Sequence, residues 1–368
     1  LLDDKQELFK EFFHSLIVSE GELPLDQLVR HIKENKPLNT VPNLIYLDGE
    51  RVIKNPKTEA LPYEQLNCPT FDQLPLEKYL MPYPVLPYMS SRGCYWGKCT
   101  FCTHSFIYDS HYRKENEVRV AEELDYLSKK YKTKYFTFSD EAISPNAFNR
   151  MSKEILKRGV EMRSLGMLKF ESSEKESAEL FDDIYRAGFL MLFFGLESAN
   201  DRILSVIDKG CDQETERAVL KHSSEAGIWN HLYLFFGFPT EEREEAEDTI
   251  RFTIENSEVE SGIIHSVGQS IFALEKDSAI YHNPAKFKID RIIQDPKRDM
   301  AIVFDYEIKS GMQREEVLDV YENFDSIIEE HFPSRKIWNY LSREHFLLYL
   351  DHYGKEEILN MASTRTAT

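Results

Sequence analysis

The feature that most constrains this chain is a regular alternation of short apolar runs and charged, helix-spaced stretches between about residues 85 and 275. The apolar runs predict six strands, at 85–89, 135–138, 163–168, 190–194, 231–236 and 263–272. The stretches between them predict helices near 115–131, 146–158, 174–187, 213–226 and 241–255. Strands that alternate with helices of this length favour repeated βα units and a parallel sheet. The pattern therefore predicts an α/β fold, built either on an open sheet or on a full or partial barrel.

The flanks of this region have a different character. Residues 1–40 predict an amphipathic helix, an apolar stretch at 16–18 and a second helix opened by the acidic segment 19–22. Proline is dense between 41 and 90, which forbids a long helix there and predicts an extended connection. After about residue 285 the spacing becomes mainly helical, at 313–331 and 335–350. We therefore divide the chain into an N-terminal region at 1–48, a linker at 49–84, the βα region at 85–284 and a helical region at 285–368.

Composition excludes several classes of protein. The chain has 64 acidic and 45 basic residues, a formal charge of −19, which disfavours nucleic acid as a partner because a nucleic-acid binder needs a basic surface. No apolar run approaches the roughly 18 residues of a membrane span, and the acidic N-terminus does not resemble a signal peptide. Five cysteines are too few for a disulfide framework in 368 residues. We expect a cytoplasmic protein without a membrane partner.

Three of the five cysteines, Cys94, Cys99 and Cys102, lie within nine residues, shortly after the first predicted strand. Loops at the carboxyl ends of parallel strands are where α/β folds place their sites. Together with His104 the three thiols would form a Cys₃His zinc site, which is a common structural site. Alternatively they would hold three irons of an iron–sulfur cluster and leave the fourth iron open for chemistry. The spacing alone supports both interpretations.

The residues around the cysteines favour the cluster. Tyr95, Trp96 and Phe101 surround the ligands with large apolar rings, which lower the local dielectric constant and exclude water. A shell of this kind tunes a redox centre more than it serves a structural ion. Phe101, between the last two cysteines, also has the shape to stack on a planar group of a ligand.

With this set of cysteines the sequence resembles the radical S-adenosylmethionine (radical SAM) superfamily. The usual motif of that superfamily has three residues between its first two cysteines and two between the next pair, whereas this chain has four and two. The resemblance covers about residues 85–275. It implies a partial (β/α)₆ barrel of the TIM type, with a [4Fe-4S] cluster on Cys94, Cys99 and Cys102 and with S-adenosylmethionine bound beside it.

Two further motifs match the ends of the second and third strands. In the superfamily, an acidic motif after the second strand holds the methionine amino group, and Ser139-Asp140-Glu141 stands at that place. The resemblance assigns this contact to Asp140 or Glu141. Lys169 follows the third strand, where relatives often have a basic residue for the methionine carboxylate. From the residues alone, the two acids are also ordinary caps of the following helix, and Lys169 is also an ordinary solvated lysine.

The fourth and fifth strands end in matching motifs as well. Glu197-Ser198 stands where the superfamily has polar groups that meet the ribose or the methionine portion. The backbone near Phe236 and Gly237 would flank the adenine, within a turn that continues to Glu241. Glu197 and Ser198 are alternatively helix caps, and Gly237 is alternatively an ordinary turn residue.

The resemblance also implies the chemistry. One electron from an external reductant such as flavodoxin or ferredoxin would cleave S-adenosylmethionine, and the resulting 5′-deoxyadenosyl radical would abstract hydrogen from a C–H bond of a peptide or small-molecule substrate. Epimerisation, cross-linking and methylation are the outcomes in view. Cys211 is the one cysteine after Cys102, so a second cluster is not expected in the C-terminal region. Its thiol is a candidate hydrogen donor, with an ordinary buried cysteine as the alternative.

The N-terminal region resembles the tail of the cobalamin-binding domain of cobalamin-type radical SAM enzymes. The similar segments are 19–22 and 41–46. Most of such a domain and any Asp-x-His-x-x-Gly stretch to ligate cobalt are missing from the sequence. Cobalamin is therefore compatible with a longer parent chain and disfavoured in this one. Two rival interpretations have no radical chemistry: a zinc-stabilised α/β binding module and a plain electron carrier.

Overall fold

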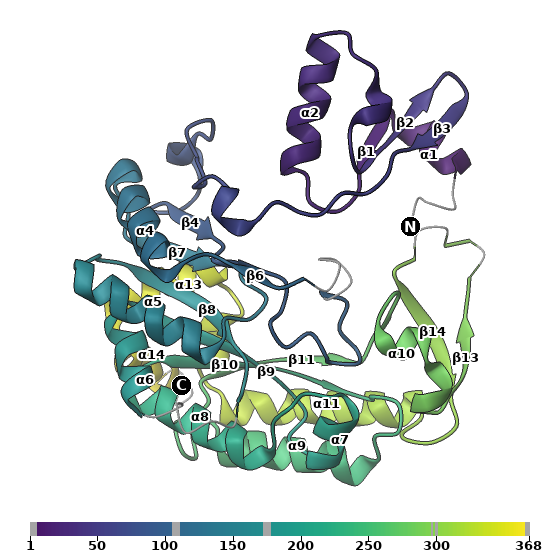
Figure 1. The fold of residues 1–368 in the computed structure, drawn as a ribbon. Helices are drawn as coiled ribbons and strands as arrows, with labels where there is room; N and C mark the ends of the chain where they lie inside the picture. The colour runs from purple at the N-terminus through teal and green to yellow at the C-terminus, as the bar shows by residue number, and fades with distance from the viewer. Residues whose placement is uncertain (1–5, 105–110, 172–177, 296, 299–300, 365–368) are drawn as a thin grey trace.

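The computed structural model describes residues 6–104, 111–171, 178–295, 297–298 and 301–364. At its centre six strands form one sheet in the order β11-β10-β9-β8-β7-β4, and every neighbouring pair is parallel. The strands are β4 (Val85–Tyr88), β7 (Tyr135–Phe138), β8 (Arg163–Leu168), β9 (Phe189–Glu197), β10 (Trp229–Phe236) and β11 (Ser266–Ile271). Their order in the sheet follows their order along the chain, as in a barrel that curves in one direction and leaves β4 and β11 as free edges (Figure 1).

Helices connect the strands and form an outer layer. They are α4 (Glu117–Tyr131), α5 (Pro145–Arg158), α6 (Ala178–Arg186), α7 (Asp201–Val206), α8 (Gln213–Glu225), α9 (Arg243–Glu255) and α11 (Arg314–His331). Local sequence fixes where they begin, since the side chains of Asn116 and Ser144 accept hydrogen bonds from the first turns of α4 and α5. The predicted partial (β/α)₆ barrel is therefore confirmed. Of the helix predicted at 174–187, residues 174–177 lie outside the described part of the chain.

Because alternate residues of a strand point to opposite faces, the sheet has two cores. Phe136 and Leu192 belong to the outer core, under the helices. Phe193 and Trp229 belong to the inner core, where the Trp229 ring lies 4.8 Å from that of Phe346. Phe346 comes from the C-terminal helices, α12 (Arg335–Trp338), α13 (Arg343–Tyr353) and α14 (Lys355–Thr364), and α13 contacts β7, β8 and β9. These helices fill the amino-terminal part of the barrel interior and leave the carboxyl-terminal part for a site.

Residues 6–54 form a small N-terminal lobe, which consists of α1 (Gln6–Phe12), β1 (Ser15–Ile17), α2 (Glu22–Lys33), β2 (Leu44–Asp48) and β3 (Arg51–Lys54). Its strands form an antiparallel sheet in the order β1-β2-β3. The β2–β3 hairpin runs past residue 48, so the lobe extends into the segment that the sequence assigned to the linker. The chain from 55 to 84 contains the short 3₁₀ helices Tyr63–Gln65 and Leu76–Lys78. The lobe stands apart from the outer helices, above the short strand β6 (Arg113–Lys114) (Figure 1).

A second small sheet follows β11. It consists of β12 (Leu274–Glu275), β14 (Val303–Ile308) and β13 (Ile289–Ile293), paired antiparallel in that order, with α10 (Ala279–His282) and the 3₁₀ helix Pro284–Phe287 between β12 and β13. The region after 285, which we expected to be mainly helical, therefore begins with two strands. In β14 partly buried and exposed residues alternate from 304 to 308, which is the period of a strand.

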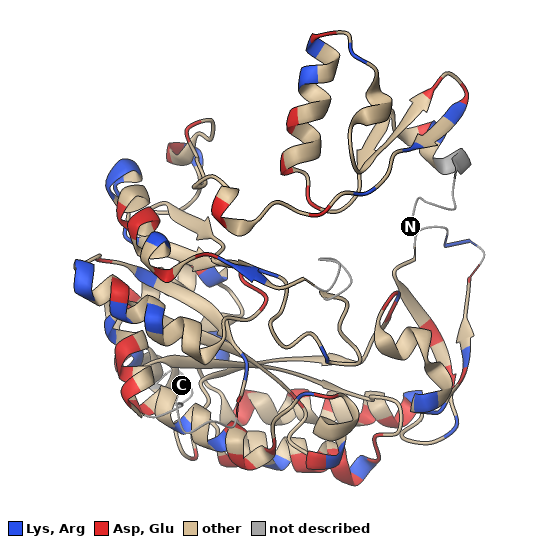
Figure 2. Ribbon diagram, viewed as in Figure 1, with Lys and Arg blue, Asp and Glu red and all other residues tan. Residues whose placement is uncertain are grey.

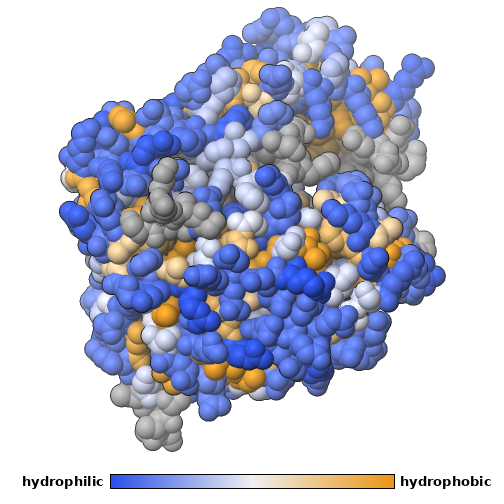
Figure 3. All heavy atoms as spheres, turned by 60° about the horizontal axis from the view of Figure 1, so that its bottom comes forward, coloured by the Kyte–Doolittle hydropathy of each residue, from blue (hydrophilic) through white to orange (hydrophobic). Residues whose placement is uncertain are grey.

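Charge and hydropathy follow these layers. Charged residues are concentrated on the outer helices and the N-terminal lobe, while the central strands are mostly uncharged (Figure 2). The face shown in Figure 3 is predominantly hydrophilic, with apolar residues in small separate areas. Within the described residues, none of the helices has the length and apolar character that crossing a membrane requires.

Two glycines that follow helices provide a matched test of this packing. Gly188 and Gly159 both have positive φ, 109° and 66°. A Cβ at Gly188 would lie 2.1 Å from the carbonyl oxygen of Met162, whereas no heavy atom lies within 4 Å of one at Gly159. We expect Gly159→Ala to lower the free energy of unfolding by about 1 kcal/mol through backbone strain, and Gly188→Ala by about 3 kcal/mol or more because the strands must separate. Urea denaturation measures both values, and equal losses would contradict the steric argument.

Candidate active site

A cavity of about 470 Å³ lies at the carboxyl ends of β8, β9, β10 and β11. Cys94, Cys99 and Cys102 all line it, so the three clustered thiols share one space. The barrel wall supplies the opposite side. The polar side chains that line the cavity with the cysteines are Thr103, His104, Glu141, Lys169, Glu197, Lys209, Ser270 and Glu275. Of the cofactor contacts predicted from the sequence, the structure brings together Phe101, Glu141, Lys169 and Glu197.

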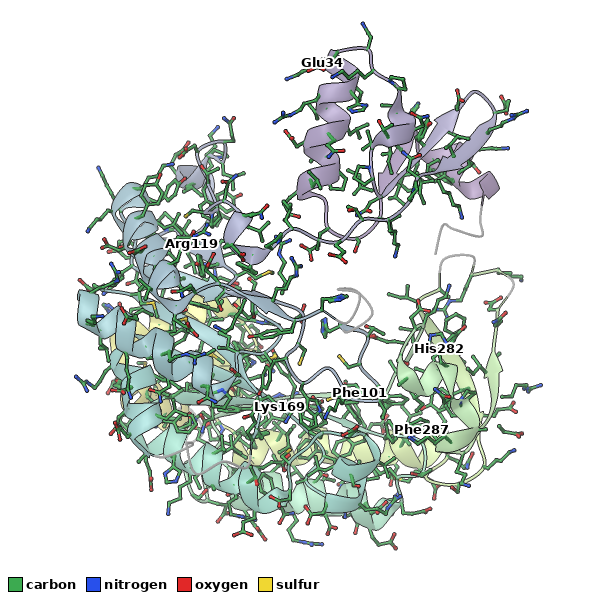
Figure 4. All side chains as sticks on the ribbon, viewed as in Figure 1. Glu34, Phe101, Arg119, Lys169, His282 and Phe287 are labelled. Carbon is green, nitrogen blue, oxygen red and sulfur yellow. The ribbon has the colours of Figure 1, made fainter. Side chains whose placement is uncertain are left out.

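The cysteine stretch is held against the barrel by contacts on both sides of Cys99. The backbone N–H of Thr100 donates to the carbonyl of Ile207, 2.9 Å away, and the Thr100 carbonyl accepts from Ile280. The Phe101 ring meets that of Phe235 on β10 edge to face, with centroids 5.2 Å apart. Figure 4 shows Phe101 and Lys169 close together at the mouth of the barrel, where both line the cavity. The stretch therefore forms the roof of the cavity.

The two neighbouring acids after β7 have different positions. Asp140 is buried, and its carboxylate accepts hydrogen bonds from Ser90 N–H (3.0 Å), Ser90 Oγ (2.7 Å) and Ser91 Oγ (2.5 Å). Burial raises the pKa of Asp140, and the hydrogen bonds from the serines act in the opposite direction. Glu141 instead lines the cavity, and its Oε2 lies 3.0 Å from His104 Nε2. Of the two candidates for the methionine amino group, Glu141 is the one that faces the cavity.

Two lysines and one glutamate lie on the cavity wall. Lys209 Nζ lies 2.9 Å from Glu197 Oε1. Burial disfavours the charge of Lys209, but the Glu197 carboxylate more than offsets this, and the pKa of Lys209 lies above its usual value. Lys169 is buried, donates to the carbonyl of Phe170 (2.8 Å) and has its pKa lowered by burial. No carboxylate among the described residues forms an ion pair with Lys169, and a buried ammonium group of this kind favours an anionic ligand, because the ligand would restore the lost solvation.

Besides Asp140, five of the predicted residues lie outside this cavity. Ser139 lines a different, smaller pocket between the linker and α4. Ser198 is buried and bonds Thr249 Oγ1 (3.1 Å), and Phe236 packs on Phe324. Gly237 donates to Glu241 and accepts from Tyr306, and it lines a neighbouring cavity. The thiol of Cys211 donates to Glu216, 3.7 Å away, and burial raises the pKa of Cys211 to about 12.

The sequence predicts Trp96 as one of the large rings around the cysteines, but not the contacts that the ring makes. Trp96 lies between Lys98 and Lys169, whose ammonium groups are 4.5 and 4.4 Å from its ring centroid. Its Nε1 donates to the carbonyl of Asp208 (2.7 Å). A Cβ on Gly210 would lie 2.2 Å from the Trp96 ring, so a glycine is required beneath it. The sequence marks these contacts only indirectly, because Trp96 lies in the interval that has one residue more than the usual motif.

The donor set fits an iron–sulfur cluster better than a single ion. Within the described residues no three His, Cys, Asp or Glu side chains are arranged around one metal position. His104 pairs with Glu141, so the Cys₃His zinc set is not formed. Thiols that share a cavity without converging suit a cubane, in which each thiolate binds a different iron. Burial raises the pKa of Cys99, and that of Cys102 to about 12, and the positive charge of bound iron would favour the thiolates that ligation requires.

Comparison with known proteins agrees with this geometry. Residues 88–253 match the model of the radical SAM superfamily. Residues 88–253 of the barrel are therefore a radical SAM domain, the domain of a superfamily of enzymes that use a [4Fe-4S] cluster and S-adenosylmethionine.

Curated relatives cover about two thirds of the chain. It is 28% identical over 244 residues to an uncharacterized methyltransferase, PH0819, of Pyrococcus horikoshii, a match that covers 65% of this chain and 52% of that protein. It is 26% identical over 255 residues to 4′-phospho-dehydrooxetanocin synthase of Priestia megaterium, with coverages of 60% and 33%. The chain thus spans about half, or less, of the length of these curated relatives.

Solved structures with a similar fold cover nearly the whole chain. The cobalamin-dependent S-adenosylmethionine radical enzyme OxsB, with aqua-cobalamin and S-adenosylmethionine bound, has a TM-score of 0.71 at 16% identity, over 98% of this chain and 56% of that one. The radical S-adenosylmethionine methyltransferase TsrM from Kitasatospora setae, with cobalamin and a [4Fe-4S] cluster bound, has a TM-score of 0.66 at 16% identity, over 99% and 79%. The resemblance to the cobalamin-type subgroup is therefore confirmed at the level of the fold, and it includes the N-terminal lobe.

Glu241 allows a test of how the turn after β10 is held. Burial raises the pKa of Glu241 to about 8, although its carboxylate accepts a hydrogen bond from Gly237 N–H at 2.6 Å. Between the ordinary pKa of 4.5 and about 8, the folded chain keeps a proton that the unfolded chain has lost. This group therefore lowers stability by about 1.4 kcal/mol per pH unit as the pH rises through that window.

Glu241→Gln keeps an acceptor for Gly237 and removes the titration. We expect its melting temperature, relative to the wild type, to rise between about pH 5 and pH 8. Glu247→Gln, at an exposed acid of α9, the helix that follows this turn, is the control. Thermal unfolding at the two pH values measures the effect, and parallel shifts in both variants would refute it.

Proposed function

We propose that this chain is a radical SAM enzyme that reductively cleaves S-adenosylmethionine and abstracts hydrogen from a C–H bond of a peptide or small-molecule substrate. The observation that supports the proposal is that Cys94, Cys99 and Cys102 line one cavity together with Glu141 and Lys169. A buried lysine and an acid on the wall opposite three thiols match the charges of a methionine carboxylate and amino group. The external reductant would be a one-electron donor such as flavodoxin or ferredoxin, in a reducing cytoplasm.

In this proposal each wall of the cavity has a task. Cys94, Cys99 and Cys102 hold three irons of a [4Fe-4S] cluster, Glu141 meets the methionine amino group and Lys169 meets its carboxylate. When bound, the cluster and S-adenosylmethionine supply a 5′-deoxyadenosyl radical to the substrate. The chain's own contribution is to orient these groups and to exclude water with the apolar walls of β8 to β11. Cys211 is not assigned a role, because its thiol faces Glu216 instead of the cavity.

The substrate has room beside the cofactor. A second cavity, of about 760 Å³, shares Ile271, Phe272 and Ala273 with the first and extends along β14 to the start of α11. Its lining includes Tyr306 and Arg314. A space of this size lies within the usual range of small-molecule sites, so it is compatible with a small molecule or with part of a peptide. Methylation belongs among the outcomes because the curated relatives include a protein named as a methyltransferase.

The direct test is anaerobic reconstitution with iron and sulfide. We expect about four irons per chain and 5′-deoxyadenosine on reduction with S-adenosylmethionine. Cys99→Ala should abolish both while the far-ultraviolet circular dichroism spectrum stays that of the wild type, because the fold does not depend on the cluster. Cys68→Ala, at a cysteine far from the cavity in sequence and not among its lining residues, is the control. One tightly bound zinc and no turnover in the wild type would refute the proposal.

Lys169 and Lys98 both lie beside Trp96, so variants of the two lysines distinguish a contact with the cofactor from a general effect of positive charge. Lys169 lines the cavity, whereas Lys98 lies on the Trp96 ring and is exposed. We expect Lys169→Met to weaken S-adenosylmethionine binding about tenfold or more, since it removes a charge-assisted hydrogen bond. Lys98→Met should leave binding within about twofold of the wild type. Equilibrium dialysis with the reconstituted protein measures both, and equal effects would show that Lys169 does not contact the cofactor.

A further inference from the structure

The stretch that carries the three cysteines begins and ends in a two-stranded ribbon, β5 (Ser91–Arg92) and β6 (Arg113–Lys114). We call this ribbon the neck. Its strands are antiparallel, and Arg92 lies directly opposite Arg113. Like charges directly opposite each other in an antiparallel pair destabilise the pair. Taken alone, the neck would therefore favour an open conformation, which would release the two ends of the cysteine stretch.

Carboxylates from the N-terminal lobe lie between these arginines. Glu20 accepts from both of them, with one oxygen on Arg92 Nη1 and the other on Arg113 Nη2, and Glu22 accepts from Arg92 Nη2. Arg113 also donates to the carbonyl of Leu61 in the linker. Figure 2 shows the positive charge of β6 beneath the lobe. The lobe thus supplies the counter-charge that the neck lacks.

These ion pairs differ from ordinary surface pairs. The side chain of Glu20 is 12% exposed, and those of Arg92 and Arg113 are 20% and 18% exposed. The pair between Asp26 and Arg30 in the same lobe is 54% and 69% exposed. Exposed pairs contribute little, whereas removing one member of a largely buried group leaves a charge without a partner, which is costly. The ion pairs between the lobe and the neck therefore contribute more free energy to the closed neck than exposed ion pairs would.

The barrel holds the other side of the neck. Asp140 accepts from Ser90 and Ser91, immediately before Arg92. A Cβ on Gly93 would lie 2.9 Å from the carbonyl oxygen of His111, so the two ends of the cysteine stretch approach each other closely at this point. The neck is thus held between a carboxylate of the barrel, Asp140, and carboxylates of the lobe, Glu20 and Glu22.

We propose that the N-terminal lobe is a positioning element for the cluster-binding stretch, in which Glu20, assisted by Glu22, keeps the neck closed by neutralising the opposed pair Arg92 and Arg113. The proposal rests on the proposed function, because it takes Cys94, Cys99 and Cys102 as the ligands of the cluster. Glu20 and Glu22 touch no cofactor. They act on the cluster through the neck.

The test compares Glu20→Gln and Glu22→Gln with the control Asp26→Asn, which breaks the exposed pair on α2. The first readout is the rate at which a chelator removes iron from the reconstituted protein. We expect this rate to rise about fivefold or more in Glu20→Gln, less in Glu22→Gln because Glu22 is more exposed, and not at all in Asp26→Asn. The second readout is hydrogen exchange of residues 93–104 in the protein before reconstitution, which should follow the same order.

A double-mutant cycle separates this role from general stability. In an Arg113→Gln background the like-charge opposition is gone, so Glu20→Gln should have at most half of its effect on iron loss. Glu20→Asp should restore much of the wild-type rate. Equal iron loss in Glu20→Gln and Asp26→Asn, or a full effect of Glu20→Gln in the Arg113→Gln background, would overturn the proposal.

Different results would refute this proposal and the proposed function. If the wild type binds no cluster, the proposed function fails before any variant is made, and hydrogen exchange of 93–104 still reports on the neck. If the wild type binds four irons and Glu20→Gln behaves as the control does, only the role of the lobe is refuted. The melting temperature of each variant identifies any global loss of folding.

Discussion

The site depends on one buried carboxylate, that of Asp140, which follows β7 and holds the two serines that follow β4. A buried carboxylate is costly unless its oxygens accept hydrogen bonds, and here three donors from adjacent residues satisfy it. The start of the cysteine stretch is therefore fixed to the sheet. Contacts of Thr100 with Ile207 and Ile280 fix its middle. Between these anchors, the chain's own contacts set the position of the thiols over the barrel.

The sequence predicted the strands and helices of the barrel well, because continuous apolar runs and apolar residues at helical spacing are distinct patterns. It predicted the placement of single side chains less well. Asp140 and Glu141 are neighbours at the end of a strand and point in different directions, so no local pattern could say which of them faces the cavity. Gly237 matches the expected turn motif, yet its N–H is used by Glu241 and it lines the adjoining cavity. The strands β13 and β14 were missed because charged residues interrupt both of them, at 290–291 and at 305 and 307, so neither forms a continuous apolar run.

The unusual spacing of the cysteines has a structural counterpart. The longer interval between Cys94 and Cys99 contains Trp96, whose indole reaches the backbone of Asp208 and lies on Gly210. The stretch is thereby tied to the segment after α7, far away in the sequence. A long-range contact of this kind is invisible in a single sequence, as is the ion pair between His104 and Glu141. The departure from the usual motif thus belongs to the way this loop is supported.

The C-terminal helices determine from which end of the barrel ligands can reach the cavity. Because α12, α13 and α14 fill the amino-terminal half of the barrel interior, that end offers no passage to the cavity. Within the described residues, the cavity lies at the carboxyl-terminal end of the barrel and adjoins the second cavity along β14. Ligands of the proposed site would therefore enter from this end. A molecule bound in the second cavity would lie beside any cofactor bound next to the thiols, and would limit its exchange with solvent.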